Sequence, residues 1–185
     1  MRLAVLILGA LAVASCQGPR VLGPEARQSS SKLDTVEMIE QVYFAVDKLL
    51  THHPKMQDTD RILVATAVDV NNVQKTSELG RVMTEVIQTR LTQRNHDVIH
   101  PTVREDHLLV QHDGQFLLSR DARNLAVDYN ARSALVATYS VVSNSVVVSM
   151  KLVSTVENST LAAQDFVLAR TESISEMLAS TPARR

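Results

Sequence analysis

The sequence predicts an α/β (α+β) fold, a two-layer sandwich with helices on one face of a mixed sheet that ends in an antiparallel three-strand meander. Two observations lead to this prediction. Along the first part of the chain, apolar stripes at helical spacing alternate with short β-branched runs. In the last third, three strand-like runs follow each other, separated only by turn-prone residues. We expect one folded domain over residues 33–180.

The first half of this domain predicts helix, strand and helix. Ser31 and Asp34 have the spacing of a capping box, and apolar residues then recur at helical spacing from Leu33 to Leu50. The apolar run over 62–68 suits a central strand that is buried on both faces. Ser77 caps a second helix, and in its first turn Gly80 stands where a side chain would obstruct packing against the strand.

The second half predicts a strand, a helix and the meander. Residues 96–100 form a short strand that Pro101 stops, and a less regular stretch leads to a helix opened by Ser119. The three runs of the meander are 134–142, 145–153 and 161–169, and apolar residues alternate with polar ones in the middle run. A box over 173–176 predicts a last helical turn.

The segment before the domain has the order of a secretory signal. Arg2 is followed by an apolar run of about twelve residues, too short for the ~20 residues of a spanning helix. The order Val13, Ala14, Ser15, Cys16 resembles the bacterial lipobox. That resemblance implies removal of residues 1–15, diacylglycerol on the Cys16 sulfur and an acyl chain such as palmitate on its amine. The alternative is an ordinary signal peptide cut nearby, which leaves a free thiol.

A lipidated Cys16 predicts the localisation. Two or more acyl chains anchor a protein stably, and Gln17 follows where an aspartate would favour the inner membrane. We expect an outer-membrane lipoprotein that faces the periplasm. Residues 16–32 hold two prolines, two glycines and three serines, and we interpret them as the lipidated cysteine and a flexible tether.

The composition of the chain excludes several function classes. The 185 residues carry a formal charge of −1, which gives no electrostatic footprint for nucleic acid. Within the folded unit only Gly80 and Gly114 are glycines, so no phosphate-binding loop and no cofactor is expected. Without tryptophan and with 3% aromatic residues, the chain offers no stacking platform for sugars or bases.

No catalytic or metal site follows from the motifs. His96 and His100 are four residues apart, but no third ligand lies near them in the sequence, so we interpret them as surface histidines. Asp69 ends the central strand, where ligands bind in α/β folds, although a turn stabilised by its own side chains is the favoured interpretation. No histidine is placed to activate Ser119, so capping explains that serine.

Four stretches within residues 61–170 together resemble the FlgO domain of outer-membrane lipoproteins. They are "ILVATAVDVNN", "TSELGRVMTEVI", "GQFLLSRDARNLA" and "YNARSALVATYSVVSNSVVVSMKLV". The third is the most specific, because six of its residues keep the order of the family without gaps: Gly114, Phe116, Leu117, Ser119, Arg120 and Asp121. More distantly, the family is similar to the amino-terminal domain of TolB and to curli-type secretion lipoproteins.

The resemblance implies a non-enzymatic role in flagellar stability and motility, at the basal body where the rod crosses the outer membrane. The implied partners are the companion lipoprotein FlgP, the ring protein FlgT and further copies of the chain. The alternative is a binding module that regulates cell-wall synthesis or an export channel. We expect residues 161–169 to form an edge strand, either open to strand addition or protected by Gln164 and Asp165.

Overall fold

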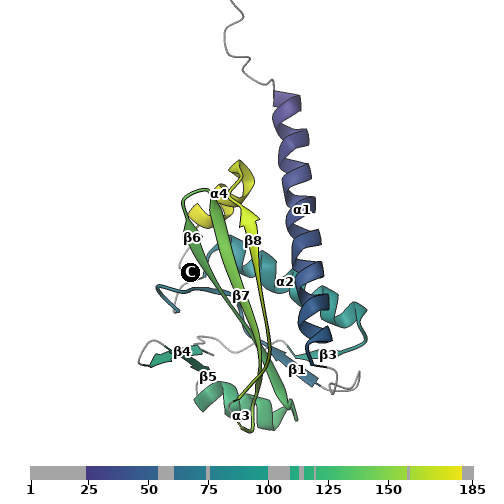
Figure 1. Ribbon diagram of the computed structural model, residues 1–185, viewed down its shortest axis with the longest axis vertical. Coiled ribbons are helices and arrows are strands. Elements are labelled where there is room, and N and C mark those ends of the chain that lie inside the picture. The colour runs from purple at the N-terminus through teal and green to yellow at the C-terminus, as the bar shows by residue number, and fades with distance from the viewer. Residues whose placement is uncertain are drawn as a thin grey trace, which may run out of the picture.

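The computed structural model describes residues 24–53, 61–73, 76–99, 109–112, 115–118, 120–157 and 159–180. Within these residues it contains four helices and eight strands (Figure 1). In chain order they are α1 (Pro24–Thr51), β1 (Arg61–Val64), β2 (Val68–Asp69), α2 (Glu78–Gln93), β3 (Asp97–Ile99), β4 (Leu109–His112), β5 (Gln115–Leu118), α3 (Arg120–Asp128), β6 (Ser133–Val142), β7 (Ser145–Ser154), β8 (Thr160–Ala169) and α4 (Glu172–Ala179).

The main sheet is mixed, as the sequence predicts. Its order is β3-β1-β6-β7-β8, and β2 pairs with β6 beyond the end of β1. Strands β3, β1 and β6 run parallel, whereas β6, β7 and β8 form the antiparallel meander. The run over 62–68 is interrupted at residues 65–67, so it supplies two strands rather than one. A separate hairpin of β4 and β5 occupies part of the stretch that we expected to be less regular.

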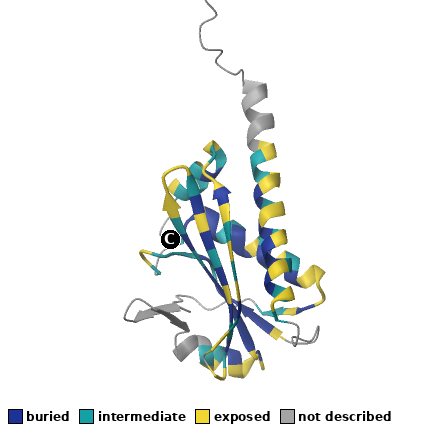
Figure 2. Cartoon of the chain, viewed as in Figure 1, coloured by how far each residue is buried: buried dark blue, intermediate teal, exposed yellow. Residues whose placement is uncertain are grey.

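The two faces of the sheet have different coverings. Alternate residues of β6 and β7, such as Leu135 and Met150, enter the main core together with side chains of α1, α2 and α4. Residues of the opposite parity, such as Ala134 and Val136, form a smaller cluster with Ala126 of α3. The predicted fold class is confirmed with one correction, because three of the four helices cover one face whereas α3 packs on the other. Figure 2 shows the buried residues, in dark blue, along the strands of the main sheet.

Helix α1 begins earlier than the capping box predicts. It starts at Pro24, so residues 24–32 of the predicted flexible tether are helical, and it includes Ser31 and Asp34, which therefore do not cap it. Proline is favoured in the first turn of a helix because its missing N–H would have no partner there. The predicted inward stripe is also wrong at its start, because Leu33 is 69% exposed and Val36 is 45% exposed. Their neighbours Asp34 and Met38 line a hollow with the end of β8 and with α4, so a different side of α1 faces the domain here. The first turns of α1 project beyond the sheet (Figure 1).

Helix α2 is bounded by capping residues at both ends. Ser77 is its N-cap, as predicted, and its side-chain oxygen accepts a hydrogen bond from the Gly80 N–H. At the other end, Asn95 has a φ of 65°, and the N–H of His96 donates to the carbonyl of Leu91. This is the left-handed ending that asparagine tolerates well. Helix α4 is capped by Thr171 rather than by Ser173, because Thr171 is the residue with extended backbone.

Candidate functional site

The predicted anchor and two of the six signature residues have no described position. Val13, Ala14, Ser15, Cys16, Gly114 and Ser119 lie outside the described residues. Phe116 and Leu117 fall in β5, opposite Gln111 and Val110 of β4, and Arg120 and Asp121 fall in the first turn of α3. The signature therefore spans the end of the small hairpin and the start of the following helix. In the described part of the chain, no helix is long and apolar enough to cross a membrane.

The polar residues after β2 form a turn. The Oδ1 atom of Asp69 accepts hydrogen bonds from the backbone N–H of Asn71 at 2.7 Å and from its side-chain Nδ2 at 3.2 Å. The carbonyl of Asp69 accepts from the N–H of Asn72 at 3.0 Å. These contacts are those of an aspartate that stabilises its own turn, which was the favoured interpretation.

Of the two histidines that were considered as ligands, one lies within the described residues. His96 is 8% exposed at the start of β3, and His100 lies outside the described residues. Burial of His96 corrects its interpretation as a surface residue, because the turn after α2 folds it back against the body. Within the described ranges, no three His, Cys, Asp or Glu side chains gather closely enough to hold a metal ion.

The N-terminus of α2 is filled by the protein's own side chains. The hydroxyl of Tyr139 donates to Ser77 Oγ at 2.9 Å and accepts from the Ser77 N–H at 3.0 Å. Thr76 donates to the carbonyl of Ala67 at 2.7 Å. A methyl group on Gly80 would overlap the Thr76 hydroxyl and come within 2.5 Å of the Ala67 carbonyl oxygen. The place where α/β proteins commonly receive a phosphate at a helix N-terminus is therefore closed.

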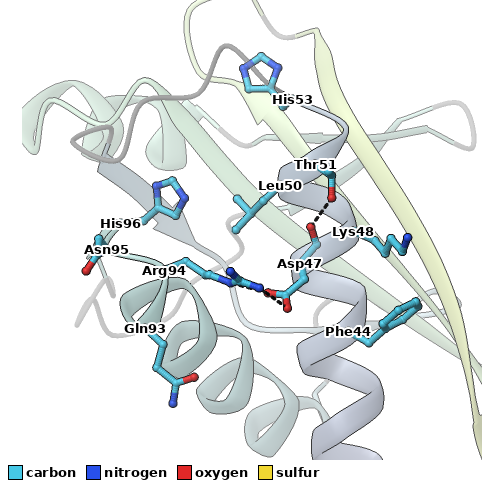
Figure 3. A pocket seen from close by; sticks show the side chains of 10 residues that line it. All are labelled: Phe44, Asp47, Lys48, Leu50, Thr51, His53, Gln93, Arg94, Asn95 and His96. Atoms are coloured by element: carbon cyan, nitrogen blue, oxygen red, sulfur yellow. Dashed lines mark hydrogen bonds and ion pairs between the residues drawn. The ribbon is translucent and has the colours of Figure 1, made fainter.

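An open groove lies instead where α1 and α2 end. It has a volume of about 670 Å³. Helix α1 lines it with Phe44, Asp47 and Lys48, and the end of α2 with the following turn lines it with Gln93, Arg94 and Asn95. We call this hollow the α1–α2 groove. Figure 3 shows Arg94 reaching from α2 to Asp47, with Phe44 and Lys48 on the side of α1 that faces away from α2.

A network of three charges joins the two helices beneath the groove. Asp47 Oδ1 accepts from Arg90 Nε at 2.9 Å and from Arg94 Nε at 2.8 Å. Asp47 Oδ2 lies 2.5 Å from a terminal nitrogen of each arginine. The hydrogen bonds from Arg90, and then those from Arg94, lower the pKa of Asp47 from 3.8 to about 2. The carboxylate is therefore charged at any physiological pH, and the network keeps one positive charge in excess.

Two pairs of aromatic and cationic side chains lie on α1 and α2, and one of them, Phe44 with Lys48, lines the groove. The Nζ atom of Lys48 lies 5.4 Å from the centre of the Phe44 ring, and Arg90 stacks over Tyr43 at 5.0 Å. Phe44 is one of three phenylalanines in the chain, and its side chain is 60% exposed. Sequence reasoning missed these residues. Two features of the sequence could have indicated them. Arg90 and Arg94 lie four residues apart, and Tyr43 and Phe44 are adjacent aromatic residues.

Strand β8 is the edge of the sheet, as expected, but its backbone is partly occupied. The carbonyl of Ala163 lies 3.3 Å from Nδ1 of His52, at the end of α1. The carbonyl of Asp165 accepts from the side-chain amide of Gln164 at 2.7 Å. Strand addition needs such carbonyls to be available. The structure therefore favours the protected edge over the open one.

A comparison with protein families matches most of the chain. The model of a family described as "FlgO protein" matches residues 43–173. That range begins next to Phe44 and ends in α4, so it includes the whole main sheet. No curated protein sequence matches the chain.

Solved structures match in fold. The C-terminal domain of LpoB from Salmonella enterica has 14% sequence identity and a TM-score of 0.50, and the match covers 70% of this chain and 96% of that one. The same domain from Escherichia coli has 17% identity and a TM-score of 0.47, with coverage of 71% and 97%. A PelC dodecamer from Paraburkholderia phytofirmans has 14% identity and a TM-score of 0.42, with coverage of 68% and 84%. At these identities the first of these likenesses shows a shared fold and no more.

Proposed function

The chain belongs to the FlgO family, and we propose that it is an outer-membrane lipoprotein that acts as a structural or assembly component of the flagellar basal body. In this role it is needed for a stable flagellum and for motility. The family match over residues 43–173 carries the proposal, because it covers both faces of the sheet and the signature before and within α3. The lipobox-like order that ends at Cys16 supports it independently.

The anchor and the shape of α1 suit such a component. Helix α1 has 28 residues and is about 42 Å long. It starts eight residues after Cys16, and eight residues span at most about 29 Å. A lipid on Cys16 would hold the start of α1 close to the periplasmic surface of the outer membrane. The other end of the helix, with the α1–α2 groove, would then face the periplasm.

We propose that the role is not enzymatic and needs no cofactor. The closed N-terminus of α2 and the turn at Asp69 support this, because both places that commonly bind ligands in α/β folds are occupied by structural hydrogen bonds. The partners we propose are FlgP, FlgT and further copies of the chain, and no nucleic acid. A subunit of this kind works through surfaces rather than through an enclosed pocket.

The test is genetic complementation in the flagellated host of the chain. A strain without the gene receives the wild type, Cys16→Ala, or the control Lys151→Ala, whose side chain is exposed on β7. We expect the wild type and the control to restore swimming and flagella, and Cys16→Ala to restore neither. Normal swimming of the strain without the gene would overturn the proposal and favour a module that serves cell-wall synthesis or an export channel.

A further inference from the structure

We propose that the α1–α2 groove binds an acidic segment of a partner protein, a linear stretch that carries carboxylates beside at least one apolar side chain. The proposal depends on the chemistry of the groove and on its distance from the anchor. It therefore does not depend on which periplasmic machine the partner belongs to.

The charge of the groove selects a negatively charged ligand. Asp47 is the one carboxylate that lines the groove among the described residues, and both its oxygens are taken up by Arg90 and Arg94. A cation would find no free carboxylate in this lining. The excess charge of the arginines and the ammonium group of Lys48 remain to attract a carboxylate. Because the guanidinium of Arg94 is held by Asp47, it is fixed in place before a ligand arrives.

The exposed aromatic ring adds an apolar contact at the same place. Phe44 is 60% exposed, and Lys48 lies over its ring. Large aromatic side chains in such positions contribute much of the affinity at protein interfaces. The side-chain amides of Gln93 and Asn95 line the other wall and offer hydrogen bonds to a peptide backbone. A segment that combines carboxylates with an apolar residue complements all three features.

The position of the groove favours a protein over a lipid surface. Phe44 lies twenty residues into α1, about 30 Å along the helix from its first residue. In Figure 1 the groove end of α1 lies beside the body of the domain, and the other end projects away from it. An anchor at the projecting end would keep the groove away from the lipid head groups of its own membrane.

The experiment measures binding of defined peptides to the full lipidated chain in nanodiscs of neutral phosphatidylcholine. One labelled peptide alternates glutamate with leucine, and a second alternates lysine with leucine. The variants are Lys48→Glu and Phe44→Ala. The matched controls are Lys151→Glu on β7 and Leu33→Ala on the projecting part of α1, both exposed and outside the groove. All four substitutions are at exposed sites, and thermal unfolding checks that each variant is folded.

We expect the acidic peptide to bind the wild type at least about tenfold more tightly than the basic peptide. Lys48→Glu and Phe44→Ala each weaken the acidic peptide about five- to tenfold. Lys48→Glu also improves binding of the basic peptide. The control variants change the affinity for neither peptide. The proposal is overturned if neither peptide binds, or if the controls weaken binding as much as the groove variants. It is also overturned if the acidic peptide does not bind while vesicles of anionic phosphatidylglycerol bind the wild type and do not bind Lys48→Glu, because the groove would then select a lipid surface.

Discussion

Replacing Asp47 by asparagine tests the charge network that joins α1 to α2. The substitution keeps the size of the side chain but removes the charge that both Arg90 and Arg94 contact. An amide can accept only part of the hydrogen bonds that the carboxylate accepts, and its NH₂ group would face two cations. We therefore expect Asp47→Asn to lower the free energy of unfolding.

The lowered pKa of Asp47 sets the magnitude. A change from 3.8 in the unfolded chain to about 2 in the folded protein corresponds to at most about 2.4 kcal/mol. The Asp47 side chain is 25% exposed, so water screens part of the interaction. We expect a contribution of about 1 kcal/mol. Because the pKa is lower in the folded state, this contribution is complete above the unfolded pKa of 3.8 and is lost as the pH falls towards about 2.

Urea unfolding of the wild type and Asp47→Asn, followed at several pH values, measures this difference. We expect the wild type to be more stable by about 1 kcal/mol at neutral pH, and the two proteins to converge near pH 2. The control is Asp97→Asn, because Asp97 contacts Arg61 at 2.8 Å while both side chains are about half exposed. It should change stability by no more than about 0.5 kcal/mol. A difference for Asp47→Asn that is absent at neutral pH, or unchanged near pH 2, would refute the reasoning.

Three further predictions concern the start of α2 and the anchor. Gly80→Ala should destabilise the protein by about 1–2 kcal/mol in urea unfolding, because the added methyl group meets Thr76 and a backbone carbonyl; equal or greater stability would contradict this close packing. Tyr139→Phe should cost about 1–2 kcal/mol, because it leaves the buried Ser77 N–H without its acceptor, and a neutral effect would count against the network. Cys16→Ala should move the chain from the membrane fraction to the soluble fraction of lysed cells, and unchanged fractionation would exclude the lipid as the anchor.

Most of the fold follows from local patterns in the sequence. The alternation of Val146, Val148, Met150 and Leu152 fixes which face of β7 is buried, and the turns on either side fix its neighbours. Ser77 marks the start of α2 correctly because its side chain has an amide of the same turn to cap. These signals lie within one element, so tertiary contacts do not overrule them.

The errors occur where distant parts of the chain decide the outcome. Leu33 and Val36 continue the apolar period of α1, but their neighbours Asp34 and Met38 face β8 and α4 instead, and no pattern within the helix reports where those elements lie. Ala126 packs on the face opposite to the other helices, and no pattern within α3 reports which face of the sheet it covers. The α1–α2 groove was missed for the same reason, since Asp47 and Arg90 are 43 residues apart.

Quantitative mass spectrometry of purified flagellar basal bodies tests the central claim most directly. Basal bodies are extracted with detergent from cells that produce either the wild-type chain or Cys16→Ala. The account predicts many copies of the wild-type chain in each basal body and a strong loss of the variant, because only the lipidated chain is held at the outer membrane. Absence of both forms from basal bodies, in cells that swim normally, would contradict the claim.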